Sequence, residues 1–350
     1  MPNDVRPLAE IVRPMRLPVW PVGSGLLSWA SERVGLPGVA RALEKRWGGR
    51  VTPMQLPVEA SDPFLLVVHH RHTFSAWDPI RPLSALVMPE GFPAHPHRGF
   101  ETVTFVLEGA MRHRDSTGVK MTYEAGSVQW LTAGRGVLHE EMWAHTAGAP
   151  HQELYQIWVN LPRARKLDEP QIQLLGPADL AAGADSVSQA PLPVAAVDGV
   201  TVTVLAGSCR GVTSPVVTRS PMTLLRLSWA APGAFAWDEL PRAHTALFFV
   251  RSGAVEVSGK RVDAGNLACF ARGGGGTARL GFTALTADTD VLLLTGAPLG
   301  EPVAMGGSMV MNTAAEVERA HRDYREGRFG PGWAHTASDE EWMATVRGTR

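Results

Sequence analysis

Residues 94–109, AHPHRGFETVTFVLEG, decide the fold class of this 350-residue chain. The part ETVTFVLEG is rich in β-branched and apolar side chains and ends at a glycine, as a strand that enters a turn does. Just before it, His95 and His97 are two positions apart, and such residues point to the same face of an extended strand. The stretch therefore predicts a β-sheet that aims two imidazoles at one point.

Strand-like runs recur on both sides of this stretch and fill the middle of the chain. Examples are VTVTVLAG from Val200 and ALFFVRSG from Ala246, each closed by glycine, and no helical segments alternate with them. ETVTFVLEGAM is echoed by HTALFFVRSGAV, which is a weak internal repeat. We therefore expect an all-β protein made of two tandem barrels of the jelly-roll type, with short flanking helices.

Composition shifts divide the chain into five parts. The segment from Gly176 to Gly199 is poor in large apolar residues, which is typical of a connector, with one helical turn after Pro177. Thr313 and Glu316 form a capping-box pattern that begins a helix at about 313–326. The expected parts are a partly helical extension (1–55), a metal-binding barrel (56–175), the connector (176–199), a second barrel without metal ligands (200–300) and a tail (301–350).

The N-terminal extension has apolar residues at helical spacing. Leu26, Leu27, Ala30 and Val34 would lie on one side of a helix that begins near Gly23. We expect this side to pack on a barrel; binding to a membrane or to a partner is the alternative that this pattern leaves open.

Charge and apolar patterning exclude several classes of function. The chain has 33 Lys and Arg against 34 Asp and Glu, so it has no broad basic surface for direct contact with nucleic acid. No apolar run approaches the roughly 20 residues that span a bilayer, and the first residues do not resemble a secretory signal. We expect a cytoplasmic protein without a membrane partner, in which Cys209 and Cys269 are buried thiols.

A second polar pair has the same spacing as the histidines. His139 and Glu141, in VLHEEM, are again two positions apart, so two strands could bring four ligands together with His95 and His97. Buried imidazoles and a carboxylate require a compensating charge, which a divalent metal supplies. Three nitrogens and one oxygen would leave two positions open on an octahedral metal, which suits a catalytic site.

Several segments around these pairs resemble the pirin family, which has two cupin barrels. The resemblance is carried by GFPAHPHRGFETVTFVLEGAMRHRDSTG, GSVQWLTAGRGVLHEEM and LYQIWVNLP, and by DPFLLVVHH and MVMNTAAEVERAHRDYREGRFG further away. It implies one metal ion, most often Fe(II), although other transition metals also suit this ligand set. The ligands that the resemblance implies are His95, His97, His139 and Glu141. The second barrel has one histidine in the corresponding place, His244, and we expect no metal there.

Other residues are open to more than one interpretation. Glu101 occupies the position from which many other cupins supply a carboxylate ligand, and strand alternation from His97 also turns it inward. The pirin resemblance favours Glu141 as the fourth ligand and leaves Glu101 as a neighbouring acid. His113, in MRHRDSTG, is a second residue that could lie beside the metal. The alternative is that it is a hydrogen-bonded residue of a turn. The VHHRH run, with His69 and His70, predicts an exposed strand end.

The resemblance implies two kinds of function. One is an iron-dependent dioxygenase like quercetin 2,3-dioxygenase, which acts on a small aromatic substrate of the flavonol type with dioxygen. In this role Glu141 would be the general base for the substrate hydroxyl. The alternative is a non-catalytic, iron- or redox-responsive protein that regulates a partner protein.

Overall fold

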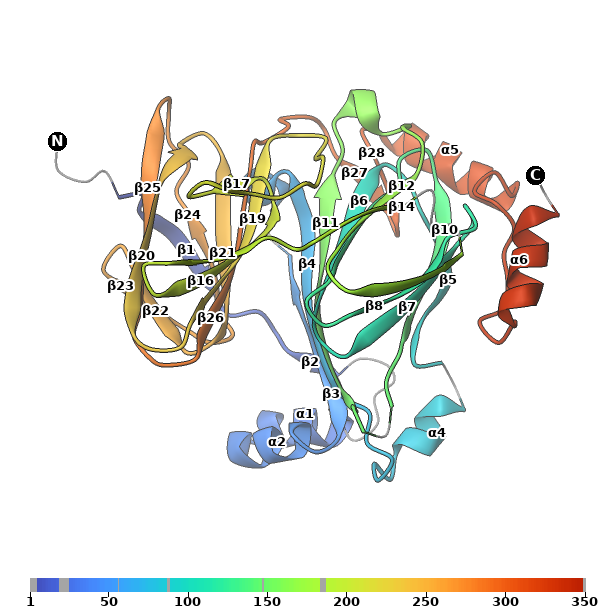
Figure 1. The fold of residues 1–350 in the computed structure, drawn as a ribbon, viewed down its shortest axis with the longest axis horizontal. Coiled ribbons are helices and arrows are strands. Elements are labelled where there is room, and N and C mark those ends of the chain that lie inside the picture. Colours follow the sequence, from blue (N-terminus) through green and yellow to red (C-terminus); the bar gives the residue numbers. More distant parts are fainter. Residues whose placement is uncertain are drawn as a thin grey trace. The chain divides into compact units, whose positions relative to one another are not determined.

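The computed structural model describes residues 5–18, 25–55, 57–86, 89–146, 148–182 and 187–348. Strands predominate in these residues, and the chain divides into two compact units, each built around a β-barrel (Figure 1). The unit called the second barrel comprises Met1–Pro14, Met54–Leu65 and Pro191–Gly300. The unit called the first barrel comprises Met15–Pro53, Leu66–Ala190 and Glu301–Arg350. The predicted all-β class with two cupin barrels is thus confirmed.

The second barrel consists of a seven-stranded sheet, β1-β24-β21-β26-β19-β16-β15, and a four-stranded sheet, β20-β25-β22-β23. Its core contains Trp229, Phe248 and Phe282, and Cys209 and Cys269 are buried free thiols, as predicted. The element bounds are β1 (Leu8–Val12), α3 (Val58–Ser61), β15 (Val194–Val197), β16 (Val200–Ala206), β17 (Ser208–Cys209), β18 (Val212–Thr213), β19 (Met222–Trp229), β20 (Gly233–Pro241), β21 (Thr245–Ser252), β22 (Ala254–Val257), β23 (Lys260–Asp263), β24 (Leu267–Phe270), β25 (Thr277–Ala284) and β26 (Thr289–Gly296).

The first barrel consists of a five-stranded sheet, β13-β8-β7-β10-β5, and an eight-stranded sheet, β14-β12-β9-β6-β11-β4-β3-β2. Its strands are β2 (Leu17–Pro18), β3 (Gly48–Met54), β4 (Phe64–Thr73), β5 (Gly91–His97), β6 (Phe100–Glu108), β7 (Ala110–Asp115), β8 (Lys120–Glu124), β9 (Val128–Thr132), β10 (Val137–Trp143), β11 (His151–Asn160), β12 (Gln171–Leu175), β13 (Ala178–Ala182), β14 (Val187–Ala190), β27 (Ala304–Gly306) and β28 (Met309–Met311). Its helices are α1 (Gly25–Arg33), α2 (Pro37–Glu44), α4 (Arg81–Ala85), the 3-10 turn η1 (Arg163–Arg165), α5 (Ala314–Arg325) and α6 (Asp339–Arg347).

A sharp turn at Gly99 separates β5 from β6. Gly99 has a φ of +84°, and a Cβ at this position would lie 2.0 Å from the carbonyl oxygen of Val310. Only glycine tolerates both conditions. Because the turn interrupts the extended backbone, the alternation of faces along β5 does not continue into β6.

The C-terminal tail folds against the five-stranded sheet of the first barrel (Figure 1). The Thr313 side chain accepts a hydrogen bond from the Glu316 backbone and begins α5, and Ser338 begins α6 in a capping box. Leu138 of β10 packs with Val317 in α5. The tail thereby covers the outer face of the strand that carries His139.

The segment 176–199 differs from the expected connector. It contains β13, β14 and β15, which pair with β8, β12 and β16, and the predicted helical turn after Pro177 is a strand instead. Small side chains such as alanine suffice here because β13, β14 and β15 each form the edge of a sheet and need to cover little apolar surface. The change from one unit to the other falls between Ala190 and Pro191.

The N-terminal extension is partly helical, but its apolar residues are not packed as expected. Leu26, Leu27 and Val34 are 50 %, 48 % and 72 % exposed. α1 is held instead through Ser28, whose hydroxyl accepts a hydrogen bond from Arg50 of β3. In the described residues no helix is long and apolar enough to cross a membrane.

Candidate metal centre

Three of the predicted ligands meet inside the first barrel. β5 supplies His95 and His97, and the neighbouring antiparallel strand β10 supplies His139 as the register partner of His95. One potential ligand nitrogen from each ring lies within 4.8 Å of those of the other two. The ring centroids are 4.5 to 4.7 Å apart. The two-residue spacing in β5 and the pairing with β10 together produce this convergence.

The chemical state of the three rings fits a metal ion. Burial lowers the pKa of His97 and of His139 well below the usual value, and burial also lowers the pKa of His95. All three are therefore neutral at pH 7, which is the form that binds metals. Within the described part of the chain neither ring nitrogen of buried His139 has a hydrogen-bond partner. His95 Nδ1 lies 2.8 Å from the carbonyl oxygen of Pro93, which leaves Nε2 for a metal.

Glu141 lies on the same face of β10 as His139, but it is held by protein donors. Its Oε1 accepts hydrogen bonds from Tyr123 (2.8 Å) and Thr104 (3.0 Å), and its Oε2 accepts one from Gln156 (2.8 Å). The group of converging ligand atoms within the described residues consists of the three histidines and does not include Glu141. Its negative charge nevertheless acts on His95, where it partly offsets the lowering of the pKa by burial.

Glu101 does not face the barrel interior, contrary to the inward direction expected from strand alternation. Thr104 of β6 points inward to Glu141, and Glu101 is three residues earlier on the same regular strand, so it lies on the opposite face. Its buried Oε1 accepts a hydrogen bond of 2.6 Å from Thr132. The expectation failed because the turn at Gly99 resets the alternation after His97.

His113 is a buried strand residue, not a turn residue. It lies in β7 as the register partner of Glu141, and its ring centroid is 5.5 Å from that of His139. His113 Nε2 lies 3.2 Å from Asp115 Oδ2. This arrangement places an imidazole and a carboxylate beside the three histidines, where they can orient His139 or a bound ligand.

The histidine run in β4 is buried, so the predicted exposed strand end is wrong. His70 and His72 are 4 % and 2 % exposed, and His72 packs against both Phe74 and Trp143, with ring centroids 5.5 and 4.9 Å away. Both rings pack with Trp143 on the face of β4 that is opposite to the exposed Arg71. Burial lowers the pKa of His72 to about 3.

Some residues of the site gave little signal in the sequence. Tyr123 and Gln156 are far from Glu141 in the chain, and only the strand pairing brings them together. Gln156, an amide inside the apolar strand YQIWVN, is the one that could have been suspected, because a buried polar side chain needs a partner. His145 lies outside the predicted ligand pairs, and its Nε2 lies 2.5 Å from Glu90 Oε2.

Comparison with known proteins finds two family models that match this chain. The family model of pirin matches residues 50–159, and that of the pirin C-terminal cupin domain matches residues 228–330. Pirin-1 of Arabidopsis thaliana is 33 % identical over 308 residues, which cover 85 % of this chain and 95 % of that protein. A protein of Pseudomonas aeruginosa named "Putative quercetin 2,3-dioxygenase" is 37 % identical over 245 residues, which cover 68 % of this chain and 79 % of that protein.

Solved structures show the same architecture. A crystal structure of a quercetin 2,3-dioxygenase from Acinetobacter baumannii superimposes with a TM-score of 0.69 and 28 % identity, covering 93 % of this chain and 99 % of that one. The two family models match part of each barrel, and the Arabidopsis relative extends over most of the chain. The chain therefore belongs to the pirin family.

Proposed function

We propose that this protein is an iron-dependent dioxygenase that acts on small aromatic substrates of the flavonol type. The observation that carries the proposal is the convergence of three neutral histidine rings, His95, His97 and His139, whose potential ligand atoms lie within 4.8 Å of one another. The relatives named as quercetin 2,3-dioxygenases support the substrate class.

The three histidines would hold the ion, with Glu141 as the fourth ligand. When bound, Fe(II) would supply Lewis acidity and redox chemistry for the reaction with dioxygen. His113, paired with Asp115 and with its ring 5.5 Å from that of His139, would restrict the movement of the His139 ring by packing against it. The aromatic rings of Phe100 and Trp158 lie 5.0 and 5.6 Å from that of His97 and shield this side of the site from water.

Glu141 is also the proposed base for the substrate hydroxyl. Its two oxygens differ, because Oε1 is held by two buried donors, Tyr123 and Thr104, whereas Oε2 is held by the partly buried Gln156. Oε2 can therefore exchange its partner for a substrate hydroxyl more readily than Oε1. Burial, together with the charge of Glu141, raises the pKa of Tyr123 well above its usual value, so this phenol stays protonated as a donor.

The test is the turnover of quercetin by protein loaded with Fe(II) under anaerobic conditions. After oxygen is admitted, we expect the flavonol absorbance to fall and oxygen to be consumed in proportion. The His97→Ala variant should lose this activity together with its iron. His72→Phe is the matched control, because it replaces a buried histidine of the same barrel outside the proposed ligands, and it should keep its iron and most of its activity.

A flavonol loss that is no faster with iron-loaded protein than with the His97→Ala variant would contradict the proposed activity. In that case the non-catalytic alternative, a protein that binds a partner according to its iron or redox state, would be preferred. Metal analysis of the purified protein separates this result from simple failure to load iron.

A further inference from the structure

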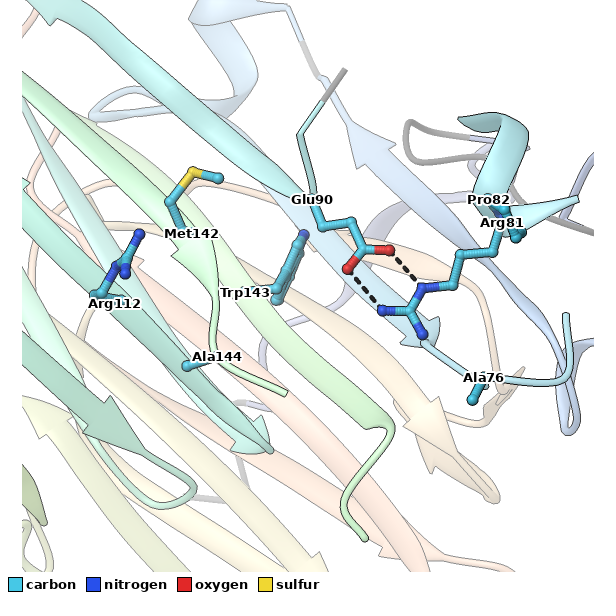
Figure 2. A pocket seen from close by; sticks show the side chains of 8 residues that line it. All are labelled: Ala76, Arg81, Pro82, Glu90, Arg112, Met142, Trp143 and Ala144. Atoms are coloured by element: carbon cyan, nitrogen blue, oxygen red, sulfur yellow. Dashed lines mark hydrogen bonds and ion pairs between the residues drawn. The ribbon is translucent and has the colours of Figure 1, made fainter. Parts of the chain in front are cut away.

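A second site lies at the end of β10 that follows Glu141. A pocket of about 540 Å³ opens there, and it is lined by Ala76, Arg81, Pro82, Glu90, Arg112, Met142, Trp143 and Ala144 (Figure 2). Its volume is in the range of small-molecule sites. None of these residues is among the proposed metal ligands.

Two of the charged residues in the pocket already neutralise each other. Arg81 Nε lies 2.5 Å from Glu90 Oε1, and a second guanidinium nitrogen lies 2.8 Å from Oε2 (Figure 2). His145 contacts the same carboxylate at 2.5 Å. Burial alone would raise the pKa of Glu90, but the hydrogen bonds from His145 and Arg81 outweigh it and lower the pKa to about 2. Glu90 is therefore ionised, and its carboxylate is already paired with Arg81 and His145.

Arg112 has no such ion-pair partner among the residues that the structure describes. It lies in β7 opposite Met142 of β10, and its Nε is buried without a hydrogen-bond acceptor in the described part of the chain. Asp339 is near enough for its pKa to be lowered by Arg112, but this carboxylate is already shared between Lys120 and Arg114. The guanidinium of Arg112 thus brings to the pocket a positive charge that no carboxylate of the described residues pairs with directly.

The rest of the lining is apolar and includes one large aromatic ring. Trp143 is 7 % exposed, and in Figure 2 it stands between Arg112 and the Arg81–Glu90 pair. Pro82, Met142 and the two alanines add apolar surface. A ligand that fits this pocket therefore has a flat apolar body to contact the apolar lining and an anionic end to pair with Arg112.

We propose that this pocket binds a small aromatic carboxylate, whose carboxylate pairs with Arg112 and whose ring packs against Trp143 and Met142. Arginine suits this role because its guanidinium can donate two parallel hydrogen bonds to a carboxylate. The bound ring would lie beside the end of β10, two residues from Glu141. The proposal does not depend on the activity proposed above, since it concerns a site with its own charge and its own walls.

The test is a ligand-observed NMR titration of the metal-free full-length protein. Metal-free protein is used because carboxylates also ligate metals. Benzoate should bind to a single site, and its neutral analogue benzamide should bind about tenfold more weakly or worse, because the pairing with Arg112 is lost. Arg112→Gln should reduce the affinity for benzoate to that for benzamide.

Two further variants keep the test decisive if Arg112→Gln folds poorly. Ala76→Trp places bulk at an exposed lining position, so it should block both ligands without disturbing the core. Arg135→Gln is the matched control: it removes an arginine whose side chain is 53 % exposed and which lies outside the pocket, so the affinity should stay within about twofold of wild type.

Equal binding of benzoate and benzamide, or no binding of either, would overturn the proposal. So would benzoate binding that survives both Arg112→Gln and Ala76→Trp but disappears in His97→Ala, because the anion would then occupy the metal centre.

Discussion

Arg114 and Glu140 form a buried ion pair on the outer face of the strands that carry the metal centre, with Arg114 Nε 2.5 Å from Glu140 Oε1. Glu140 lies between His139 and Glu141 in β10, and its side chain points away from theirs. The tail completes the pair, because Trp333 Nε1 donates to Glu140 Oε2 at 2.9 Å and Arg114 donates to the carbonyl oxygen of Ala337 at 2.9 Å.

Glu140→Gln should destabilise the first barrel by about 3–5 kcal/mol, because it leaves the buried Arg114 without its main counter-charge. Urea unfolding of the metal-free protein measures this loss. Because Glu140 also fixes the backbone between His139 and Glu141, the same variant should bind its metal more weakly. As a control, Arg135→Gln breaks the exposed pair with Glu169 and should cost less than about 1 kcal/mol. A similar cost for both variants would contradict the structural role of the buried pair.

Metal binding should stabilise the protein, because the three histidines converge only in the folded state. At a free Fe(II) concentration of 100 times the dissociation constant, the free energy of unfolding should rise by about 2.7 kcal/mol. Thermal unfolding under anaerobic conditions, with and without a chelator, measures the shift. In His97→Ala the shift should disappear. If it persists there, the metal is bound by other residues.

The fourth ligand can be identified by comparing two acid-to-amide substitutions. Glu141→Gln should reduce turnover more than it reduces metal content, since three histidines remain and the base is lost. Glu101→Gln should leave the metal content near that of wild type, because Glu101 faces away from the three histidines and contacts Thr132. Metal analysis and activity measured on the same preparations distinguish the two effects. Normal turnover in Glu141→Gln would remove the base assignment.

The sequence predicted those parts of the site that depend on a single strand. His95 and His97 share a face because two residues separate them within β5, and this relationship requires no knowledge of the fold. Glu101 was misplaced because the turn at Gly99 lies between it and His97, so the alternation could not be carried across. Contacts between strands were beyond such reasoning, and Tyr123 reaches Glu141 only through the pairing of β7 with β8 and β10.

Burial was the other quantity that the sequence could not supply. The prediction of an exposed strand end for the VHHRH run in β4 depends on the alternating direction of its side chains and on its position outside the pirin motif. In the structure β4 lies between β11 and β3, and the ring of His72 fits against Gly49, where a Cβ would lie 1.9 Å from His72 Nδ1. A glycine far away in the chain therefore makes room for this buried imidazole.

The buried His72 should make the stability of the protein depend on pH. Burial, with a smaller contribution from His69, lowers the pKa of His72 from 6.5 to about 3. Between these two values the unfolded chain binds a proton that the folded chain does not, so acidification favours unfolding. The free energy of unfolding should fall by about 1.4 kcal/mol per pH unit from this one group.

His72→Phe, which keeps an aromatic ring against Phe74 and Trp143, should remove that part of the slope in urea unfolding of metal-free protein between pH 6 and about 4. His335→Phe replaces an exposed histidine and should leave the slope as it is. An unchanged slope in His72→Phe would show that His72 is protonated as easily in the folded protein as in the unfolded chain, and that its buried environment does not disfavour the charge.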